Sequence, residues 1–132
     1  MMLSWAVRNP TKLSAYAGIY PVQNLRSWPM KWNLGVTLRD FEMDEKTFIQ
    51  RIDEHNPINH LAGMAKAKVP IFIVHGDSDK VVTLEENSGL VESRYRELGG
   101  KVYVEVVPSG GHQVIDAFFK SKNLIEFLTK HS

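Results

Sequence analysis

The feature that most constrains the fold is a short apolar run followed at once by glycine and acidic residues. Residues 69–82 read VPIFIVHGDSDKVV, with four consecutive apolar side chains from Ile71 to Val74. An apolar run of this length, bounded by proline and glycine, is typical of a strand that is buried on both faces. The run ends at His75-Gly76, and Asp77 and Asp79 follow it. Such a strand can hold a carboxylate at the rim of a sheet.

The rest of the second half alternates between helix and strand patterns. Residues 84–100 begin with acids, repeat apolar residues at helical spacing and stop at Gly-Gly. Residues 101–108 alternate as a strand does, and 114–131 form an apolar-faced terminal helix. The order strand, helix, strand, helix predicts an α/β fold with a parallel sheet and right-handed crossovers. Ligands of such sheets collect outside the carboxyl ends of the strands.

The first half has a different organisation. Residues 1–8 predict the end of a helix closed by Asn9-Pro10, and 12–22 a short buried strand. A long irregular connection is expected at 23–43. It is followed by a helix at 44–57 that stops at Pro57, and by a second short helix at 58–69. Long connections in compact domains are usually functional or lid-like.

Composition excludes several classes of function. With 132 residues the chain fits one domain, and its net charge of +1 gives no case for nucleic acid or an anionic membrane. It has no cysteine, so disulfides, thiolate metal sites and a cysteine nucleophile are excluded. No run approaches the roughly 18 apolar residues of a membrane span. No basic leader precedes an apolar region, so the chain as given is expected to be cytoplasmic. We expect no cofactor and no bound metal.

Two loops carry residues that could act together. Asp77 and Asp79 follow one predicted strand, and Gly110-Gly111-His112 follows the next. A carboxylate that accepts from one imidazole nitrogen fixes the tautomer and leaves the other nitrogen free as a general base. The glycines would give the backbone freedom to present His112. The alternative is that a turn aspartate simply bonds its own backbone and that His112 is an ordinary loop residue.

These segments together resemble a known family. VPIFIVHGDSDKVVTLEENS, then GGKVYVEVVPSGGHQV and a closing helix, are similar to the C-terminal part of an α/β-hydrolase, in the esterase and prolyl-oligopeptidase-like branch. LSWAVRNPTKLSAYAGIYPV resembles the helix and strand that follow the nucleophile. The resemblance implies that Asp79 is the acid, His112 the base, and Asp77 a turn-shaping residue. His75 is expected to be structural. Thr83 stands where the family has proline.

The nucleophile of that family is absent. Its serine lies in G-x-S-x-G on a strand-to-helix turn, and no such motif occurs here. We therefore expect residues 1–132 to be the C-terminal portion of one hydrolase domain, with the serine and the oxyanion donors upstream. The strand within 12–22 would then expose an unpaired edge, through which the chain could self-associate. The isolated chain is expected to lack hydrolase activity.

The substrate and the reaction leave alternatives open. The resemblance places a lid or cap at about 23–60, where Trp28 and Trp32 could line a pocket for a small-molecule ester; the alternative, which we prefer, is that they pack the cap onto the body. The predicted function is ester hydrolysis by a Ser-His-Asp triad. The alternatives are a serine peptidase of the prolyl-oligopeptidase type, a non-catalytic truncated homologue, and metal-dependent hydrolysis through His75, Asp77, Asp79 and His112.

Overall fold

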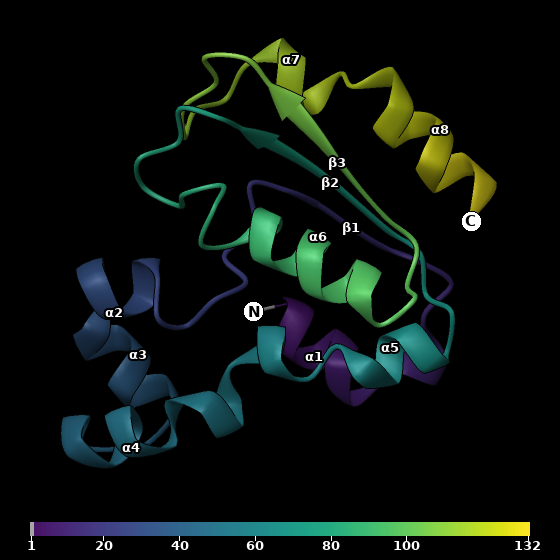
Figure 1. Ribbon diagram of the computed structural model, residues 1–132. Coiled ribbons are helices and arrows are strands. Elements are labelled where there is room, and N and C mark those ends of the chain that lie inside the picture. The colour runs from purple at the N-terminus through teal and green to yellow at the C-terminus, as the bar shows by residue number, and fades with distance from the viewer. Residues whose placement is uncertain (1) are drawn as a thin grey trace.

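The buried strand predicted from the apolar run lies at the centre of a parallel sheet. The computed structural model describes residues 2–132, and its sheet has three strands in the order β1-β2-β3 (Figure 1). These strands are β1 Tyr16–Ile19, β2 Ile71–Gly76 and β3 Val102–Val107. Both pairings are parallel, with Tyr16 opposite Ile71 and Ile71 opposite Val102. The expectation of a parallel α/β sheet is confirmed.

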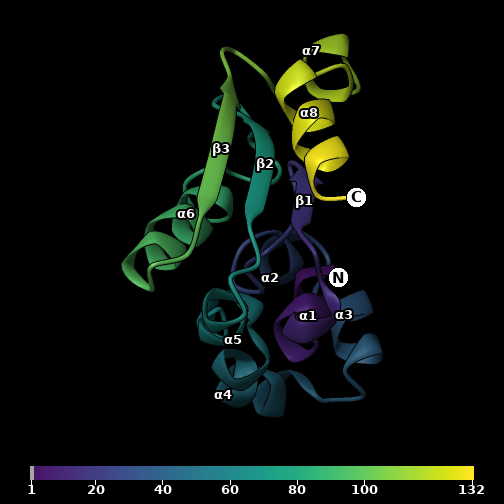
Figure 2. The same ribbon diagram turned by 90° about the vertical axis from the view of Figure 1, so that its right-hand side faces the viewer.

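Helices cover the sheet on both faces, as Figure 2 shows. One face packs against α6 Ser88–Glu97, and the other against α7 Asp116–Phe119 and α8 Lys122–Lys130. Successive side chains of β2 point to opposite faces, as the pleat requires. Ile71 and Ile73 therefore join the core under α6, whereas Phe72 and Val74 join the core under α7 and α8.

Four of the other elements lie beside the α6 face of the sheet. They are α1 Met2–Arg8, the 3-10 turns Pro10–Lys12 and Pro57–Asn59, and α5 Ala62–Lys66. Leu3, Leu61 and Met64 bring them into the same buried cluster as Ile71 and Ile73. The helix expected at the start of the chain is therefore observed from Met2, and Met1 lies outside the described residues.

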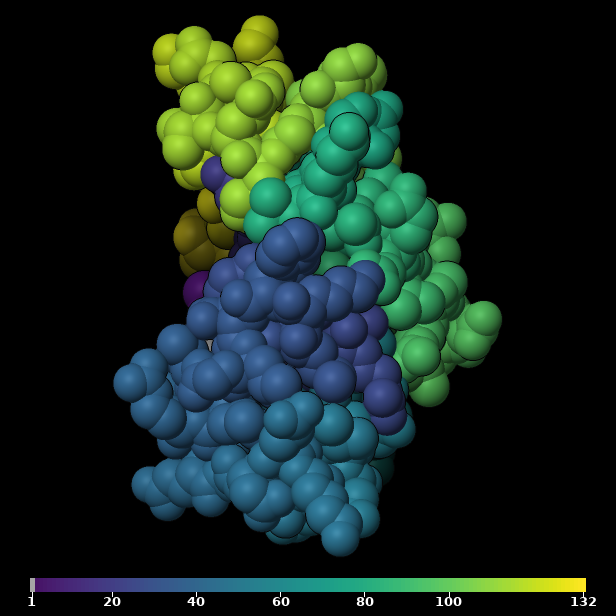
Figure 3. Space-filling view, turned by 90° about the vertical axis from the view of Figure 1, so that its left-hand side faces the viewer, coloured from purple at the N-terminus to yellow at the C-terminus, as the bar shows by residue number. Residues whose placement is uncertain are grey.

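The connection at 23–43 is helical rather than irregular. It contains α2 Trp28–Trp32 and α3 Leu34–Asp40, and α4 Glu45–His55 follows it. Proline at the second position of α2 starts a helix well because its missing N–H needs no partner there. These short helices gain stability from a core of their own around Leu25, Phe48 and Ile52, which periodicity over the connection alone does not show. In Figure 3 this segment occupies the lower part of one face, below the residues that follow β2 and β3.

The helix expected at 114–131 is divided in two. Ser121 lies between α7 and α8, and its hydroxyl accepts a hydrogen bond from the Leu124 N–H at 3.1 Å. This N-cap starts a new helix at Lys122. Across residues 2–132, no helix combines the length and the apolar character that crossing a membrane requires.

Two glycines let the loops after β2 and β3 approach each other. A side chain on Gly76 would overlap the carbonyl of Gly110, so this contact needs glycine at the end of β2. Ser78 N–H donates to the Gly110 carbonyl at 3.0 Å, and Asp77 N–H donates to the Val107 carbonyl at 3.3 Å. The two loops are thus joined through their backbones.

We predict that Gly76→Ala destabilises the protein by about 3 kcal/mol or more, because backbone rather than a flexible side chain must move. Gly35→Ala is the matched control, because Gly35 lies in α3 with no heavy atom near the added carbon. The control should be neutral or gain up to about 1 kcal/mol in helix propensity. Urea unfolding followed by circular dichroism measures both, and equal stability of the two variants would contradict the packing argument.

Candidate active site

Asp79 lies in the turn that follows β2, and its carboxylate is held on both oxygens. Oδ1 accepts the backbone N–H groups of Val81 and Val82, each at 2.9 Å. Oδ2 accepts from Nδ1 of His112 at 2.8 Å. The side chain of Asp79 has no exposed surface, so these bonds replace water as the solvation of the charge.

His112 lies in the loop after β3 and is open to solvent on its other side. Its side chain is 34% exposed, and its Nδ1–H donates to Asp79. Within residues 2–132, no protein atom forms a hydrogen bond with its Nε2. The tautomer with the proton on Nδ1 leaves the lone pair of Nε2 available to take a proton. The structure therefore brings together the two residues that the sequence singled out.

The glycines before His112 have a different role from the expected one. The residue of this loop with left-handed backbone is Ser109, with φ of 55°, rather than Gly110 or Gly111. Ser109 is held there because its N–H donates to Oδ1 of Asp77 at 2.7 Å. Gly110 instead leaves room for the ring of Phe118 and for Val107. Asp77 thus joins the two loops and does not contact His112.

His75 is buried behind Asp79 and closes the turn that carries it. Its Nε2 donates to the Val82 carbonyl at 2.8 Å and lies 3.6 Å from Oδ2 of Asp79. Its Nδ1 lies 2.6 Å from the hydroxyl of Ser88 at the start of α6. Val82 therefore donates its N–H to Asp79 and accepts from His75, so the acid turn is held from two sides.

Burial lowers the pKa of His75 below its usual 6.5, so the imidazole is neutral at pH 7. A neutral ring that donates from Nε2 must accept at Nδ1, and the donor is the hydroxyl of Ser88. The hydroxyl oxygen of Ser88 can then accept a hydrogen bond from another group. The Gln23 amide lies 3.2 Å from it, and within residues 2–132 the amide nitrogen of Gln23 is otherwise buried without a partner. A half-turn of that amide places its N–H₂ on Ser88, so that Ser88 accepts from Gln23 and donates to His75.

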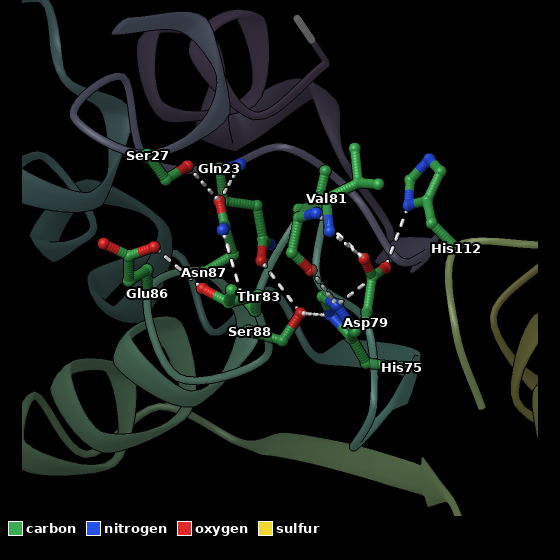
Figure 4. A network of polar contacts seen from close by, with 11 residues as sticks. Gln23, Ser27, His75, Asp79, Val81, Thr83, Glu86, Asn87, Ser88 and His112 are labelled. Atoms are coloured by element: carbon green, nitrogen blue, oxygen red, sulfur yellow. Dashed lines mark hydrogen bonds and ion pairs between the residues drawn. The ribbon is translucent and has the colours of Figure 1, made fainter. Parts of the chain in front are cut away.

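Asn87 connects the helical segment to the same turn. Its Oδ1 accepts the N–H groups of Gln23 and Asn24 at 2.9 and 3.1 Å and the hydroxyl of Ser27 at 3.2 Å, while its Nδ2 donates to the Thr83 carbonyl at 3.1 Å. Figure 4 shows this network running from Ser27 through Asn87, Gln23, Ser88 and His75 to Asp79. These bonds therefore couple the position of Asp79 to that of the first residues of segment 23–60.

Tyr20 is a site residue that sequence reasoning missed. It follows β1 with left-handed backbone, φ 32°, and its ring lies 4.5 Å from the ring of His112. Its ring also lies edge-on to those of Phe118 and Phe119, at 5.1 and 6.2 Å. Strained backbone in a bulky residue at a strand end often marks a functional site. The signal available in the sequence was its place beside Pro21, at the carboxyl end of a predicted strand.

The other predicted site residues do not join this pair. Trp28 lines a hollow between α1 and the helical segment, whereas Trp32 is 72% exposed. Among residues 2–132, no three His, Asp or Glu side chains converge as metal ligands. The physical reason is that both ring nitrogens of His75 have protein partners and Asp77 faces Ser109. Nor does any serine hydroxyl of the described residues bond to His112, and that of Ser78 donates to Asp77.

Comparison with solved structures places this arrangement in a known fold. The chain superposes on a protein described as a candidate dipeptidyl aminopeptidase IV from Bacteroides ovatus with a TM-score of 0.76 at 13% identity, over 100% of this chain and 18% of that one. It matches the acylaminoacyl peptidase of Pyrococcus horikoshii with a TM-score of 0.73 at 15% identity, over 98% and 22% of the two chains. This chain has part of the α/β-hydrolase fold.

The α/β-hydrolase comparison also includes an esterase. A truncated carbohydrate esterase from gut microbiota matches with a TM-score of 0.52 at 27% identity, over 68% of this chain and 30% of that one. The chain thus spans between about a fifth and a third of the solved chains it matches. Neither a family model nor a curated protein sequence matches it.

The depressed pKa of His75 predicts a specific pH dependence of stability. Below pH 6.5 the unfolded chain binds a proton at this histidine and the folded chain does not, so stability falls as the pH is lowered from about 7 toward the folded pKa. Each pH unit in that window costs up to about 1.4 kcal/mol. His75→Gln removes this contribution, so its unfolding free energy should depend less steeply on pH than that of the wild type.

Urea unfolding between pH 5 and 8 measures this difference, and His60→Gln is the control at an exposed histidine. Parallel curves for the wild type and His75→Gln would show that the pKa of His75 is the same in the folded and unfolded chains, which would contradict the prediction.

Proposed function

We propose that this chain supplies the acid and the base of a serine hydrolase that cleaves ester bonds in small molecules. The single observation that carries the proposal is the 2.8 Å bond from Nδ1 of His112 to a fully buried Asp79, with Nε2 of His112 left open. Asp79 fixes the tautomer and stabilises the imidazolium. His112 takes the proton of a serine hydroxyl as that oxygen attacks the carbonyl, and then returns it to the leaving group.

The nucleophile in this proposal comes from polypeptide outside residues 1–132. The G-x-S-x-G motif is absent from the sequence, and within residues 2–132 no hydroxyl bonds to the open nitrogen. We infer that the strand that carries the serine lies beside β1. Among the described strands, β1 pairs with β2 on one edge, and its other edge has no partner. Oxyanion donors would belong to the same polypeptide. Self-association through the edge of β1 is the competing use of that surface.

Peptide-bond hydrolysis is the second candidate. It is favoured by the match to the Pyrococcus horikoshii acylaminoacyl peptidase over 98% of this chain, compared with 68% for the carbohydrate esterase. Both reactions use the same acid and base, so the two candidates differ in the leaving group that His112 protonates.

The test uses a longer polypeptide, expressed from the coding sequence of this chain together with the coding sequence upstream of it. p-Nitrophenyl acetate and a peptide p-nitroanilide are the two substrates. His112→Ala and Asp79→Asn should each lower kcat by about 10³-fold or more, because each removes one member of the triad. Asp77→Asn is the matched control, because asparagine keeps an oxygen that accepts from Ser109 N–H. Ester turnover that greatly exceeds anilide turnover supports the esterase.

Full turnover after His112→Ala, or equal losses at Asp77 and Asp79, would overturn the assignment. In the 132-residue chain alone, a fluorophosphonate probe should label no serine. Stoichiometric labelling of the isolated chain would show that a nucleophile lies within it.

A further inference from the structure

A hollow that the Asp79–His112 pair does not use lies between α1 and the helical segment 23–60. Its volume is about 620 Å³, which falls within the range of roughly 300–1,000 Å³ for small-molecule sites. About half of its wall is apolar, and this part includes Val22, Leu25, Trp28, Phe41 and Met43. A site of this size and lining accommodates a ring or a short acyl chain.

One end of the hollow is polar. Ser4, Arg8 and His55 line it, and the same three residues also line an adjoining hollow of about 250 Å³. Within residues 2–132, the hydroxyl of Ser4 and Nε2 of His55 are buried and have no hydrogen-bond partner. A buried polar atom left unpaired costs about 1–3 kcal/mol. A ligand that offers acceptor oxygens here would offset that cost.

The group at this end that can bind an anion is Arg8, which lines both hollows. Arg8 takes part in none of the ion pairs among residues 2–132. Arginine presents a planar fork of donors that matches a carboxylate. Asp40 of α3 also lines the hollow, and Glu54 lines the adjoining one. Neither forms an ion pair with Arg8, so the guanidinium remains free for a ligand.

We propose that this hollow binds a carboxylate attached to an aromatic or short aliphatic group. The carboxylate accepts hydrogen bonds from Arg8, His55 and Ser4, and the apolar part lies against Trp28 and Phe41. The ring of Phe41 lies 5.3 Å from that of His55 and helps to hold the imidazole in place.

One short segment of the chain links the hollow to the candidate active site. Tyr20 contacts the ring of His112, and Val22, two residues further along, lines the hollow. The bound acid would therefore be the acidic end of a substrate or a carboxylate product, which rests on the proposed function. Binding itself does not depend on hydrolysis, so it is tested separately.

The test titrates the 132-residue chain with 3-phenylpropionate and with its neutral amide, 3-phenylpropanamide. Amide and indole N–H signals in ¹H–¹⁵N spectra follow binding, and shifts should centre on Trp28 and His55. The acid should bind about tenfold more tightly than the amide, because it accepts charged hydrogen bonds. Arg8→Gln should remove most of that preference, and Asp40→Asn should strengthen binding of the acid.

Lys12→Gln is the matched control, because Lys12 is an exposed cation near α1 that does not line the hollow. His55→Leu is the second variant and should weaken binding of the acid, but not of the amide. Equal affinities for acid and amide would overturn the proposal. So would equal effects of Arg8→Gln and Lys12→Gln, or no binding to a chain whose spectrum shows a folded protein.

Discussion

The arrangement of the site depends on the close approach of two backbones at the carboxyl ends of β2 and β3. Gly76 and Gly110 meet where no side chain fits, and Ser78 N–H donates to the Gly110 carbonyl. This contact sets the distance between the turn that carries Asp79 and the loop that carries His112. A parallel sheet supplies the constraint, because its neighbouring strands end at the same edge. Without that approach, the two side chains would lie on separate loops.

The buried polar network gives the acid its rigidity. Three hydrogen bonds hold the carboxylate of Asp79, and a neutral His75 closes the turn from behind. The same network reaches Asn87 and segment 23–60, so the helices of that segment and the acid are positioned together. A charge that is solvated by fixed donors needs little reorganisation when the neighbouring imidazole becomes charged. That property suits an acid whose role is to orient a base.

The sequence predicted the parts of the site that follow strand ends. Asp77, Asp79 and His112 became candidates because they follow strands with clear apolar patterns and glycines, and the family resemblance selected Asp79 over Asp77. Tyr20 and Asn87 were not predicted as site residues. Their roles come from partners far along the chain, which are His112 for Tyr20 and residues 23–27 for Asn87. The helices α2 and α3 were missed for a related reason. Their stability depends on a small core with α4 that no local pattern reports.

Apolar periodicity and glycine placement are local properties, and they were enough to predict the α/β class, the order of helices and strands in the second half, and two aspartates and one histidine as candidates. The bonds from His112 to Asp79 and from Ser109 to Asp77 arise in the folded chain. Both aspartates follow the same strand two residues apart, and their side chains differ only in the direction that the turn gives them. That direction depends on backbone contacts between two loops about thirty residues apart along the chain.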